Sequence, residues 1–381
     1  MKGVIKIMEK SKVYFCDLRT RAGYGLLEKL NNLITKAGMK EIDFDEKLTA
    51  IKIHFGEYGN LAFIKPNYVK GVVDLIKESG GKPFLTDAST LYVGTRSDAV
   101  GHIHTAELNG FNSVTTGCNV VIADGLKGND YTAIPVNLKH CSNVKIGNAI
   151  TEADVIISMN HFKGHEMTGF GGVLKNLGMG CGSKLGKLEM HASSKPKYDN
   201  SKCIGCGKCK KNCNQDAIYF EDKKAYIDYE KCVGCGQCIV NCEYDVITPV
   251  PGNPSVTLNE KITEYAYGVL EGKPSFHISF IMNVSPNCDC WSSNDYPIVP
   301  DIGIAASFDP VALDNACAHL VNQAPPLVNS KLSDVIEKNK CDCEHDDKFK
   351  LVHPNTDWMS GLTYASELGL GNLDYELIRL D

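Results

Sequence analysis

The sequence predicts an α/β domain with a largely parallel sheet, interrupted near its middle by a small cysteine-rich α+β module. Three observations carry this prediction. Short apolar segments alternate with amphipathic ones over residues 1–199, the alternation resumes over residues 251–381, and residues 200–250 contain two matching cysteine runs. We therefore expect residues 1–199 and 251–381 to form one discontinuous domain into which residues 200–250 are inserted.

The first half of the chain contains apolar segments of strand length. They are LTAIKIHF (48–55), KPFLTDAS (82–89), CNVVIAD (118–124) and ADVIISM (153–159). Between the first two lies NYVKGVVDLIKESGG (67–81), which has helical periodicity and ends at a glycine pair, a common helix terminator. Strands separated by helices in this way are typical of a parallel sheet.

The same pattern returns after the cysteine runs. We expect helices at 256–272 and 309–323, and strands at 275–284 and 302–307. Asp309 precedes Pro310, which is the favoured order of an N-cap and a first helical residue. The proline-containing segments PKYDNSK and ITPVPGNPS flank the cysteines and are the expected junctions of the insertion.

Composition narrows the class of protein. The 381 residues are 43% apolar and 23% charged, as in ordinary globular proteins, and the net charge of −6 argues against a nucleic-acid binder. The lysine-containing N-terminus lacks an apolar run of signal-peptide length, and no stretch approaches 18 apolar residues. We expect a cytoplasmic protein that binds neither nucleic acid nor membrane.

Seventeen cysteines are many for a chain in a reducing compartment, where disulfides are not expected. Eight of them form the runs CIGCGKCKKNC and CVGCGQCIVNC, in which every cysteine recurs 29 residues later. These residues are Cys203, Cys206, Cys209 and Cys213, then Cys232, Cys235, Cys238 and Cys242. Thiolates at this spacing, with glycines between them, suit an iron–sulfur cubane. Zinc sites of the C-x2-C type are the alternative, which the eight-cysteine register disfavours.

Residues 200–250 resemble bacterial two-cluster ferredoxins. The resemblance implies two [4Fe–4S] clusters, with the fourth cysteine of each run ligating the other cluster. One cluster would then use Cys203, Cys206, Cys209 and Cys242, and the other Cys232, Cys235, Cys238 and Cys213. Asn214 and Glu243 stand where the family usually has a proline. Because proline shapes the turn but does not ligate the cluster, this departure leaves the expected ligands unchanged and affects only the reduction potentials.

A block rich in glycine, histidine and lysine, residues 159–191, follows the strand expected at 153–159. The carboxyl ends of parallel strands are where open α/β sheets bind ligands. We expect catalytic or binding side chains here, foremost His161, Lys163, His165 and Lys175, with Lys184, Lys187 and His191 adding charge and proton donors.

Two further features of this region are weaker signals. Gly171 and Gly172 precede a helix whose N-terminal N–H groups suit an anion, although the glycines match no nucleotide-binding motif, and tight turns are the simpler interpretation. His54 and Glu57, at the end of an earlier strand, are candidates for the same cleft.

NHFKGHEMTGFGGVLKNLGMGC, followed by PDIGIAASFDPVALDNAC, resembles the DUF362 family, and the resemblance extends over most of the chain outside the cysteine runs. Members of this family are often joined to a 4Fe–4S module and are commonly named Fe–S center proteins. The resemblance implies this domain pairing but no established reaction.

Eight of the nine cysteines outside the runs divide into two kinds. Cys288 and Cys290, like Cys341 and Cys343, are C-x-C pairs, which together would supply four ligands for zinc or a third cluster, or would act separately as redox or structural pairs. Four others have the surroundings of ordinary buried thiols, namely Cys16, Cys118, Cys141 and Cys317.

The leading hypothesis is an iron–sulfur oxidoreductase that takes low-potential electrons from a redox partner and delivers them to a small anionic substrate on the α/β domain. An electron-transfer subunit docked on a separate enzyme is one alternative. A metallocofactor assembly or delivery factor that uses the C-x-C pairs is another.

Overall fold

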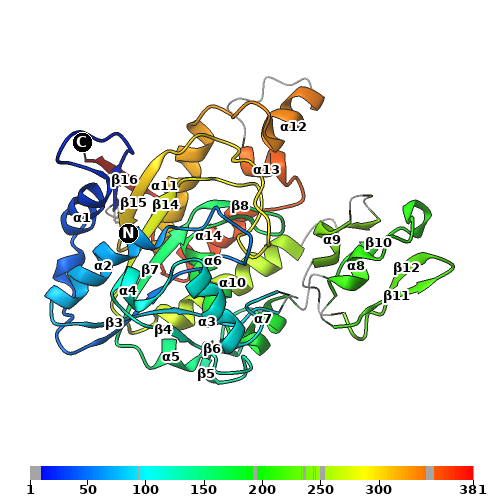
Figure 1. Ribbon diagram of the computed structural model, residues 1–381, viewed down its shortest axis with the longest axis horizontal. Coiled ribbons are helices and arrows are strands. Elements are labelled where there is room, and N and C mark those ends of the chain that lie inside the picture. Colours follow the sequence, from blue (N-terminus) through cyan, green and yellow to red (C-terminus); the bar gives the residue numbers. More distant parts are fainter. Residues whose placement is uncertain are drawn as a thin grey trace, which may run out of the picture.

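A computed structural model describes residues 10–91, 94–191, 195–213, 215–232, 234, 237–242, 244, 246–248, 254–339 and 347–380. The chain forms an α/β body and a small lobe, residues 195–248, which we call the cysteine lobe (Figure 1). Among the described residues, no helix combines the length and apolar character that a membrane span needs.

In the described part of the chain, eight strands form the central sheet. Their order is β16 (Tyr375–Arg379), β1 (Ser11–Cys16), β15 (Gly303–Ser307), β14 (Ser275–Ile281), β7 (Val155–His161), β2 (Leu48–Lys52), β3 (Lys82–Asp87) and β4 (Val120–Ile122). β15 runs antiparallel to both of its neighbours, and every other neighbouring pair is parallel. The predicted α/β class with a largely parallel sheet is therefore confirmed. Strands from both sides of the cysteine lobe share this sheet.

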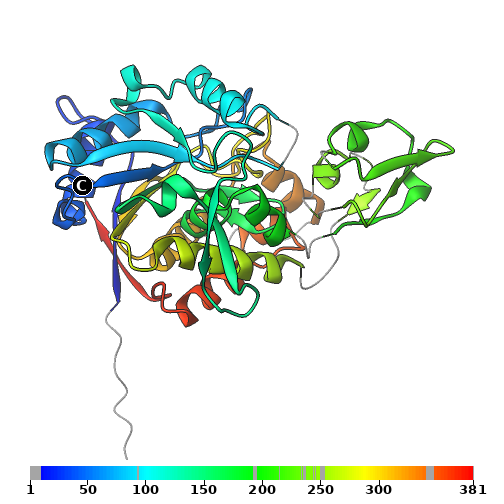
Figure 2. The ribbon, with the colours of Figure 1, turned by 90° about the horizontal axis from the view of Figure 1, so that it is seen from below.

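Helices cover both faces of the sheet. α1 (Leu26–Lys36) and α2 (Pro66–Glu78) pack on one face, near α3 (Ala99–Leu108) and α4 (Ser113–Thr116). The other face carries α6 (Val173–Cys181), α10 (Pro254–Leu270), α11 (Pro310–Gln323) and α14 (Trp358–Glu367). Figure 2 shows the cyan helices α3 and α4 on one side of the sheet and the yellow-green α10 on the other.

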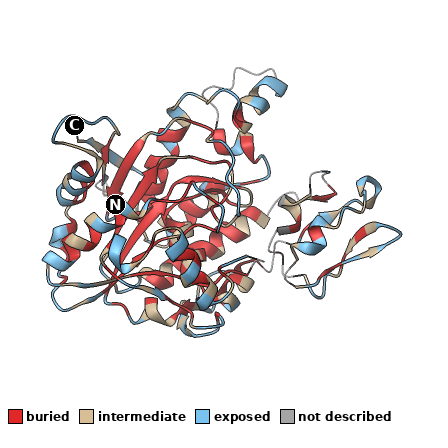
Figure 3. Ribbon diagram, in the orientation of Figure 1, coloured by how far each residue is buried: buried red, intermediate tan, exposed pale blue. Residues whose placement is uncertain are grey.

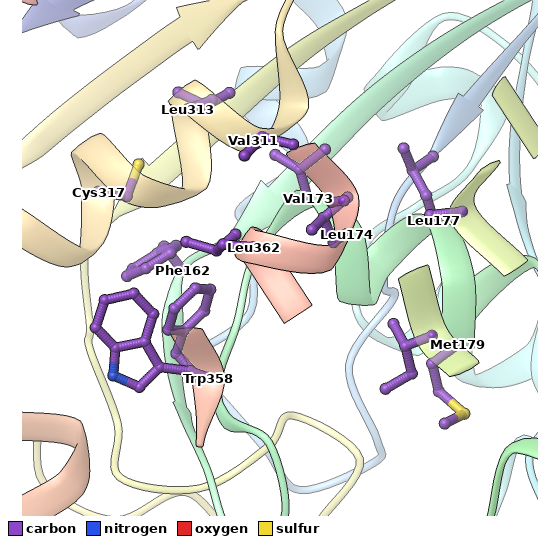
Figure 4. Packing of buried hydrophobic residues seen from close by; sticks show 14 of the residues in the cluster. Phe162, Val173, Leu174, Leu177, Met179, Val311, Leu313, Cys317, Trp358 and Leu362 are labelled. Atoms are coloured by element: carbon purple, nitrogen blue, oxygen red, sulfur yellow. The ribbon is translucent and has the colours of Figure 1, made fainter. Parts of the chain in front are cut away.

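Alternation along the central strands supplies both cores. Val155 and Ile157 of β7 point to the side of α1 and α2, whereas Ile156 joins the core of the opposite face. In that second core, side chains of α6, α11 and α14 meet, among them Leu174, Val311 and Leu362 (Figure 4). The sheet is accordingly the most deeply buried part of the molecule (Figure 3).

Most predicted elements are present with small shifts. α2 ends at Glu78, just before the glycine pair, and the carboxylate of Asp309 accepts hydrogen bonds from the N–H groups of Val311 and Ala312, as expected of an N-cap. β2 and β14 end three residues earlier than the apolar runs suggest, and β7 continues to His161. The outer strands β1 and β16 carry no sequence prediction.

Smaller elements complete the body. They are η1 (Met39–Glu41), β5 (Tyr131–Pro135), β6 (Asn143–Gly147), α5 (Asn148–Thr151), β8 (Lys163–His165), β9 (Gly169–Gly171), α7 (Lys184–His191), α12 (Lys331–Asn339) and α13 (Lys348–Val352). β5 pairs with β6 and β8 pairs with β9, each as an antiparallel hairpin. The β8–β9 hairpin places Lys163 and Gly171 opposite each other, directly after β7.

The cysteine lobe has its own small core. Its first strand, β10 (Lys197–Tyr198), pairs with its last, β13 (Ile247–Thr248), so the two ends of the segment lie side by side. Between them are η2 (Asn200–Lys202), α8 (Lys208–Lys211), the hairpin of β11 (Ile218–Glu221) and β12 (Lys224–Ile227), and α9 (Gln237–Val240). The apolar residues of the hairpin and of β13 pack against the cysteines, and Figure 3 shows that most of the lobe is half-buried or exposed.

Candidate functional site

A pocket opens at the carboxyl ends of four adjacent parallel strands, β14, β7, β2 and β3. Its empty volume is about 650 Å³, with open solvent at the mouth included. The chain passes from β2 to β3 through α2 on one face of the sheet, and from β7 to β14 through α6 and α10 on the other. Because β2 and β7 are neighbours, the pocket lies where the connections diverge, the usual ligand crevice of an open α/β sheet.

The walls of the pocket carry an excess of positive charge. Its cationic side chains are Lys52, Arg96, Lys163, Lys175 and Lys187, whereas Asp87 is its carboxylate. His54, His161, Asn176, Cys288 and Cys290 supply most of its other polar or sulfur atoms. A cavity of this size and charge suits a small anionic ligand.

A buried ion-pair network forms one wall. The Nζ atom of Lys52 lies 3.0 Å from Oδ1 of Asp87 and 2.7 Å from Oδ1 of Asn176. Arg96 bridges two carboxylates, with Nε 3.0 Å from Oε2 of Glu57 and Nη1 3.4 Å from Oδ2 of Asp87. Burial alone would raise the pKa of Asp87, but Lys52 and the neighbouring cationic groups outweigh it and hold that pKa below its ordinary range.

Two cationic groups of the pocket have unusual surroundings. The Nη2 atom of Arg96 is buried and has no hydrogen-bond partner in the described part of the structure. Lys187 hydrogen-bonds the carbonyl of Gly182 at 2.5 Å, and burial lowers its pKa to about 8. An anionic group of a ligand would satisfy Arg96, and Lys187 is suited to exchanging a proton near neutral pH.

His161 is held by the protein at both ring nitrogens. Nδ1 lies 2.7 Å from Oδ2 of Asp289, and Nε2 lies 2.8 Å from the carbonyl oxygen of Met282. Both partners are acceptors, so the protein fixes the orientation of the ring. His161 lines the pocket as expected, and its part in catalysis stays a prediction.

Cys288 and Cys290 lie on the loop after β14. The Lys175 ammonium is 3.5 Å from Sγ of Cys288, and the backbone N–H of Cys290 is 3.5 Å from the same sulfur. A hydrogen bond from the Cys290 thiol, together with Lys175, holds the pKa of Cys288 well below its ordinary value, and the same bond raises the pKa of Cys290. The thiolate form of Cys288 is therefore favoured, and it faces a cation.

The other C-x-C pair, Cys341 and Cys343, falls outside the described residues, so the four-cysteine metal site stays a prediction. Within the described ranges, no three His, Cys, Asp or Glu side chains are grouped to hold a single metal ion. Of the pair, Cys288 lies beside the Lys175 ammonium. Four of the five other thiols, Cys16, Cys118, Cys141 and Cys317, are buried as expected, and the fifth, Cys181, is buried as well.

The other expected residues divide between the pocket and its surroundings. Lys163, Lys175, Lys187 and His54 line the pocket, and burial lowers the pKa of His54 to about 3. Glu57, His165, His191 and Lys184 are not among its lining residues. Glu57 anchors Arg96, and His165 accepts the N–H groups of Met167 and Thr168 at Nδ1 while its ring contacts Cys288.

The start of α6 does not offer the anion site that its glycines suggest. The carboxylate of Asp314 accepts the N–H groups of Val173 at 2.7 Å and Leu174 at 3.0 Å. A Cβ at Gly172 would clash with that carboxylate, and one at Gly178 would clash with the Ile262 carbonyl. The glycines therefore allow close packing, because the helix end is already capped from within the protein.

The sequence prediction does not include four residues of the pocket, Lys52, Asp87, Arg96 and Asn176, nor Asp289, which holds the pocket residue His161. Lys52 and Asp87 do carry a signal, since each is a charged residue that ends a strand in a buried position. Arg96 and Asp289 lie in loops far apart in the sequence, and no local pattern marks them.

The cysteines of the lobe fall into two groups. Cys203, Cys206 and Cys209 of the first run line one small pocket together with Cys242 of the second. In the other group, Cys213 lies close enough to Cys232 for their charges to interact. Cys238 packs in the same small core, and Cys235 falls outside the described residues.

The pocket lined by Cys203, Cys206, Cys209 and Cys242 has the apolar walls and the backbone N–H groups that suit an iron–sulfur cubane. Phe220, Ala225, Val246 and Ile247 contribute to its apolar walls. The backbone N–H of Ala225 points at Sγ of Cys203 at 3.4 Å. Gly205 and Gly207 have φ values of +74° and +76°, which an L side chain rarely adopts, so the loop turns as the spacing predicts. A four-iron cluster spreads its ligands over separate corners, in contrast to the tight grouping that a single ion needs.

Comparisons with known proteins add a family and no activity. Residues 49–319 match the model of the family described as "Domain of unknown function (DUF362)". No curated protein matches the chain. Among solved structures, the lactate racemase apoprotein from Thermoanaerobacterium thermosaccharolyticum is similar, with 10% identity, a TM-score of 0.36, and 71% of this chain and 50% of that chain covered. A Thermotoga maritima protein has 12% identity, a TM-score of 0.39, and coverages of 93% and 86%. The chain spans half the length of the racemase, and these likenesses carry no argument about activity.

Proposed function

The chain belongs to the DUF362 family, a domain of unknown function, and we propose that it is an iron–sulfur oxidoreductase. The cysteine lobe would hold two [4Fe–4S] clusters, and the pocket of the α/β body would bind the substrate that receives low-potential electrons. The observation that carries the proposal is the gathering of Cys203, Cys206, Cys209 and Cys242, from two separate runs, around one apolar pocket.

The ligand sets follow from the repeat and from this grouping. Cys203, Cys206, Cys209 and Cys242 would hold one cluster, and Cys232, Cys235, Cys238 and Cys213 the other. Such clusters supply one-electron transfer when bound. Backbone N–H groups directed at the cysteine sulfurs, such as those of Ala217 at Cys213 and Ala225 at Cys203, would stabilise the added negative charge.

The substrate would be small and anionic. Lys163 and Lys175 offer positive charge in the wall of the pocket, and Arg96 offers a buried N–H group that no described residue uses. Reduction of a bound group also needs protons, and Lys187, with its lowered pKa, is placed to supply one. A separate redox protein would deliver electrons to the exposed side of the lobe.

The test measures whether a small anion that binds in the pocket reoxidises the reduced protein. The full chain is purified without oxygen, its iron and sulfide are counted, and dithionite reduces it to a bleached visible spectrum. We expect a fraction of small anions, retained on an anion exchanger from a cell extract, to restore the absorbance repeatedly. The variants Lys163→Met and Lys175→Met should slow this reoxidation at least tenfold while iron content is unchanged.

A matched control is Lys70→Met, which removes an exposed lysine of α2 that pairs with Asp74. This variant should be reoxidised at the wild-type rate. If the two pocket variants are also reoxidised at that rate, the pocket is not where electrons leave. The chain would then be an electron-transfer subunit whose acceptor is a separate enzyme.

A further inference from the structure

Two cysteines of the pocket are separated from the eight of the lobe. Cys288 and Cys290 follow β14, on the loop that leads to β15, and both line the pocket as free thiols. Cys288 is 2% exposed, whereas Cys290 is half-buried. The pair is thus reachable from the pocket and shielded from bulk solvent.

The loop brings the two sulfur atoms together. The N–H of Cys290 lies 3.5 Å from Sγ of Cys288, and the N–H of Trp291 donates to the Cys288 carbonyl at 3.3 Å, which closes a turn. Glu166 holds this turn at two points, accepting from the Cys288 N–H at 3.4 Å and from Nε1 of Trp291 at 3.1 Å. The turn keeps the two thiols as neighbours.

The neighbouring groups shift the pKa values of the two thiols in opposite directions. The Lys175 ammonium at 3.5 Å favours the thiolate of Cys288, while the hydrogen bond that the Cys290 thiol donates to Cys288 raises the pKa of Cys290. The buried thiols elsewhere behave differently, since burial raises the pKa of Cys118 to about 11 and that of Cys141 to about 12. An attacking thiolate beside a second thiol is the arrangement that thiol–disulfide exchange requires.

We propose that Cys288 and Cys290 form a redox-active pair that reduces a small anionic disulfide bound in the pocket. The Cys288 thiolate attacks one sulfur of the substrate, the substrate S–S bond breaks, and one thiolate leaves. The Cys290 sulfur then attacks Cys288, loses its proton, and releases the second half as a thiol. The products are two substrate thiols, one of them ionised, and a Cys288–Cys290 disulfide.

Regeneration needs two electrons and one proton, which break the internal disulfide and restore one thiolate and one thiol. This step deepens the proposed function and rests on it, since two one-electron donors in the lobe would supply the electrons. The walls of the pocket account for the substrate charge. Arg96, Lys163 and Lys187 are the cations available to carboxylates on such a disulfide.

The test uses oxidised glutathione, a small anionic disulfide, as its probe. The full chain, purified without oxygen, is equilibrated in buffers of reduced and oxidised glutathione, and its free thiols are then alkylated. Mass spectrometry gives the mass of the peptide that contains residues 288–290. We expect an internal disulfide that forms and disappears reversibly with the glutathione ratio. In Lys175→Met, alkylation of Cys288 at pH 7 should slow at least tenfold, while Cys118→Ser should leave both results unchanged.

Iron content and cluster absorbance, measured on the same samples, separate the two proposals. A cycling pair in a chain that binds no iron would leave this inference standing and overturn the proposed function. A chain with eight irons whose Cys288 and Cys290 remain alkylatable at every glutathione ratio would overturn the inference alone. A mixed disulfide in Cys290→Ser, with glutathione attached to Cys288, would further support the attacking role of Cys288.

Discussion

The ammonium of Lys52 lies 3.0 Å from the carboxylate of Asp87, and both side chains are almost completely buried. The two residues end neighbouring parallel strands, β2 and β3, and both line the pocket. The desolvation of each charge is compensated by the other and by Asn176 and Arg96. Removing one member of this buried network leaves the others with an uncompensated charge, which should destabilise the folded chain.

The first prediction concerns this pair. Lys52→Met keeps the length of the side chain but leaves Asp87 with one cation fewer in a buried place, so the free energy of unfolding should fall by about 3–5 kcal/mol. Urea denaturation followed by circular dichroism measures it. The exposed pair Lys70–Asp74 offers the control, because Lys70→Met should lower the free energy by about 1 kcal/mol or less. Equal losses in the two variants would contradict the account of the buried network.

The second prediction concerns acid stability. His277 in β14 is fully buried beside Ser158, and burial lowers its pKa from 6.5 to about 3. Between these two pH values the unfolded chain binds a proton that the folded chain does not, so stability falls as the pH drops below 6.5. At pH 5 this single group should already account for about 2 kcal/mol.

The variant His277→Asn isolates that contribution, because other buried groups titrate in both proteins. Asparagine can still accept from or donate to the Ser158 hydroxyl, but it does not ionise. The stability of the wild type relative to the variant should therefore drop by about 2 kcal/mol between pH 7 and pH 5 in urea titrations. A difference that stays constant over this range would show that His277 is protonated in the folded chain.

Much of the fold could be predicted because local patterns report burial. α2 and α11 have clear signals at their ends, the glycine pair and Asp309–Pro310, and the buried strand β7 begins with three apolar residues. The edge strand β16 differs. Its residues are half-buried or exposed, and it is held by pairing with β1, a partner more than 350 residues away in the sequence. No local pattern can reveal such a pairing.

Some residues of the candidate pocket could also be predicted from the sequence, whereas their partners could not. Lys163 and Lys175 were identified because they follow the carboxyl end of a strand, a rule of position that the sequence alone can apply. The partner of His161 could not be predicted, because Asp289, which engages its ring, comes from a loop 128 residues away. The N-terminus of α6 was misjudged for the same reason, since its capping carboxylate, Asp314, belongs to α11.

The third prediction concerns Lys187. Burial lowers its pKa from 10.5 to about 8, so the folded chain carries an ammonium there below that pH and a neutral amine above it. After reductive methylation with ¹³C-formaldehyde, one dimethyl-lysine resonance should titrate near pH 8 in an NMR experiment. The same resonance should be missing from Lys187→Met. If every lysine resonance titrates above pH 9.5, Lys187 cannot exchange protons at neutral pH, and its proposed part in reduction fails.

The fourth prediction tests how the lobe would bind its clusters, through pairs of substitutions. If Cys242 completes the set of Cys203, Cys206 and Cys209, then Cys203→Ser with Cys242→Ser damages one cluster, and about four irons should remain. Cys203→Ser with Cys213→Ser damages both, and almost none should remain. Iron and acid-labile sulfide, measured after anaerobic purification, give the counts, and Cys118→Ser in the α/β body should retain about eight irons. The opposite ranking of the two double variants would mean that each run ligates its own cluster, and the shared pocket of Cys242 and Cys203 would then reflect folding of the lobe without cross-ligation.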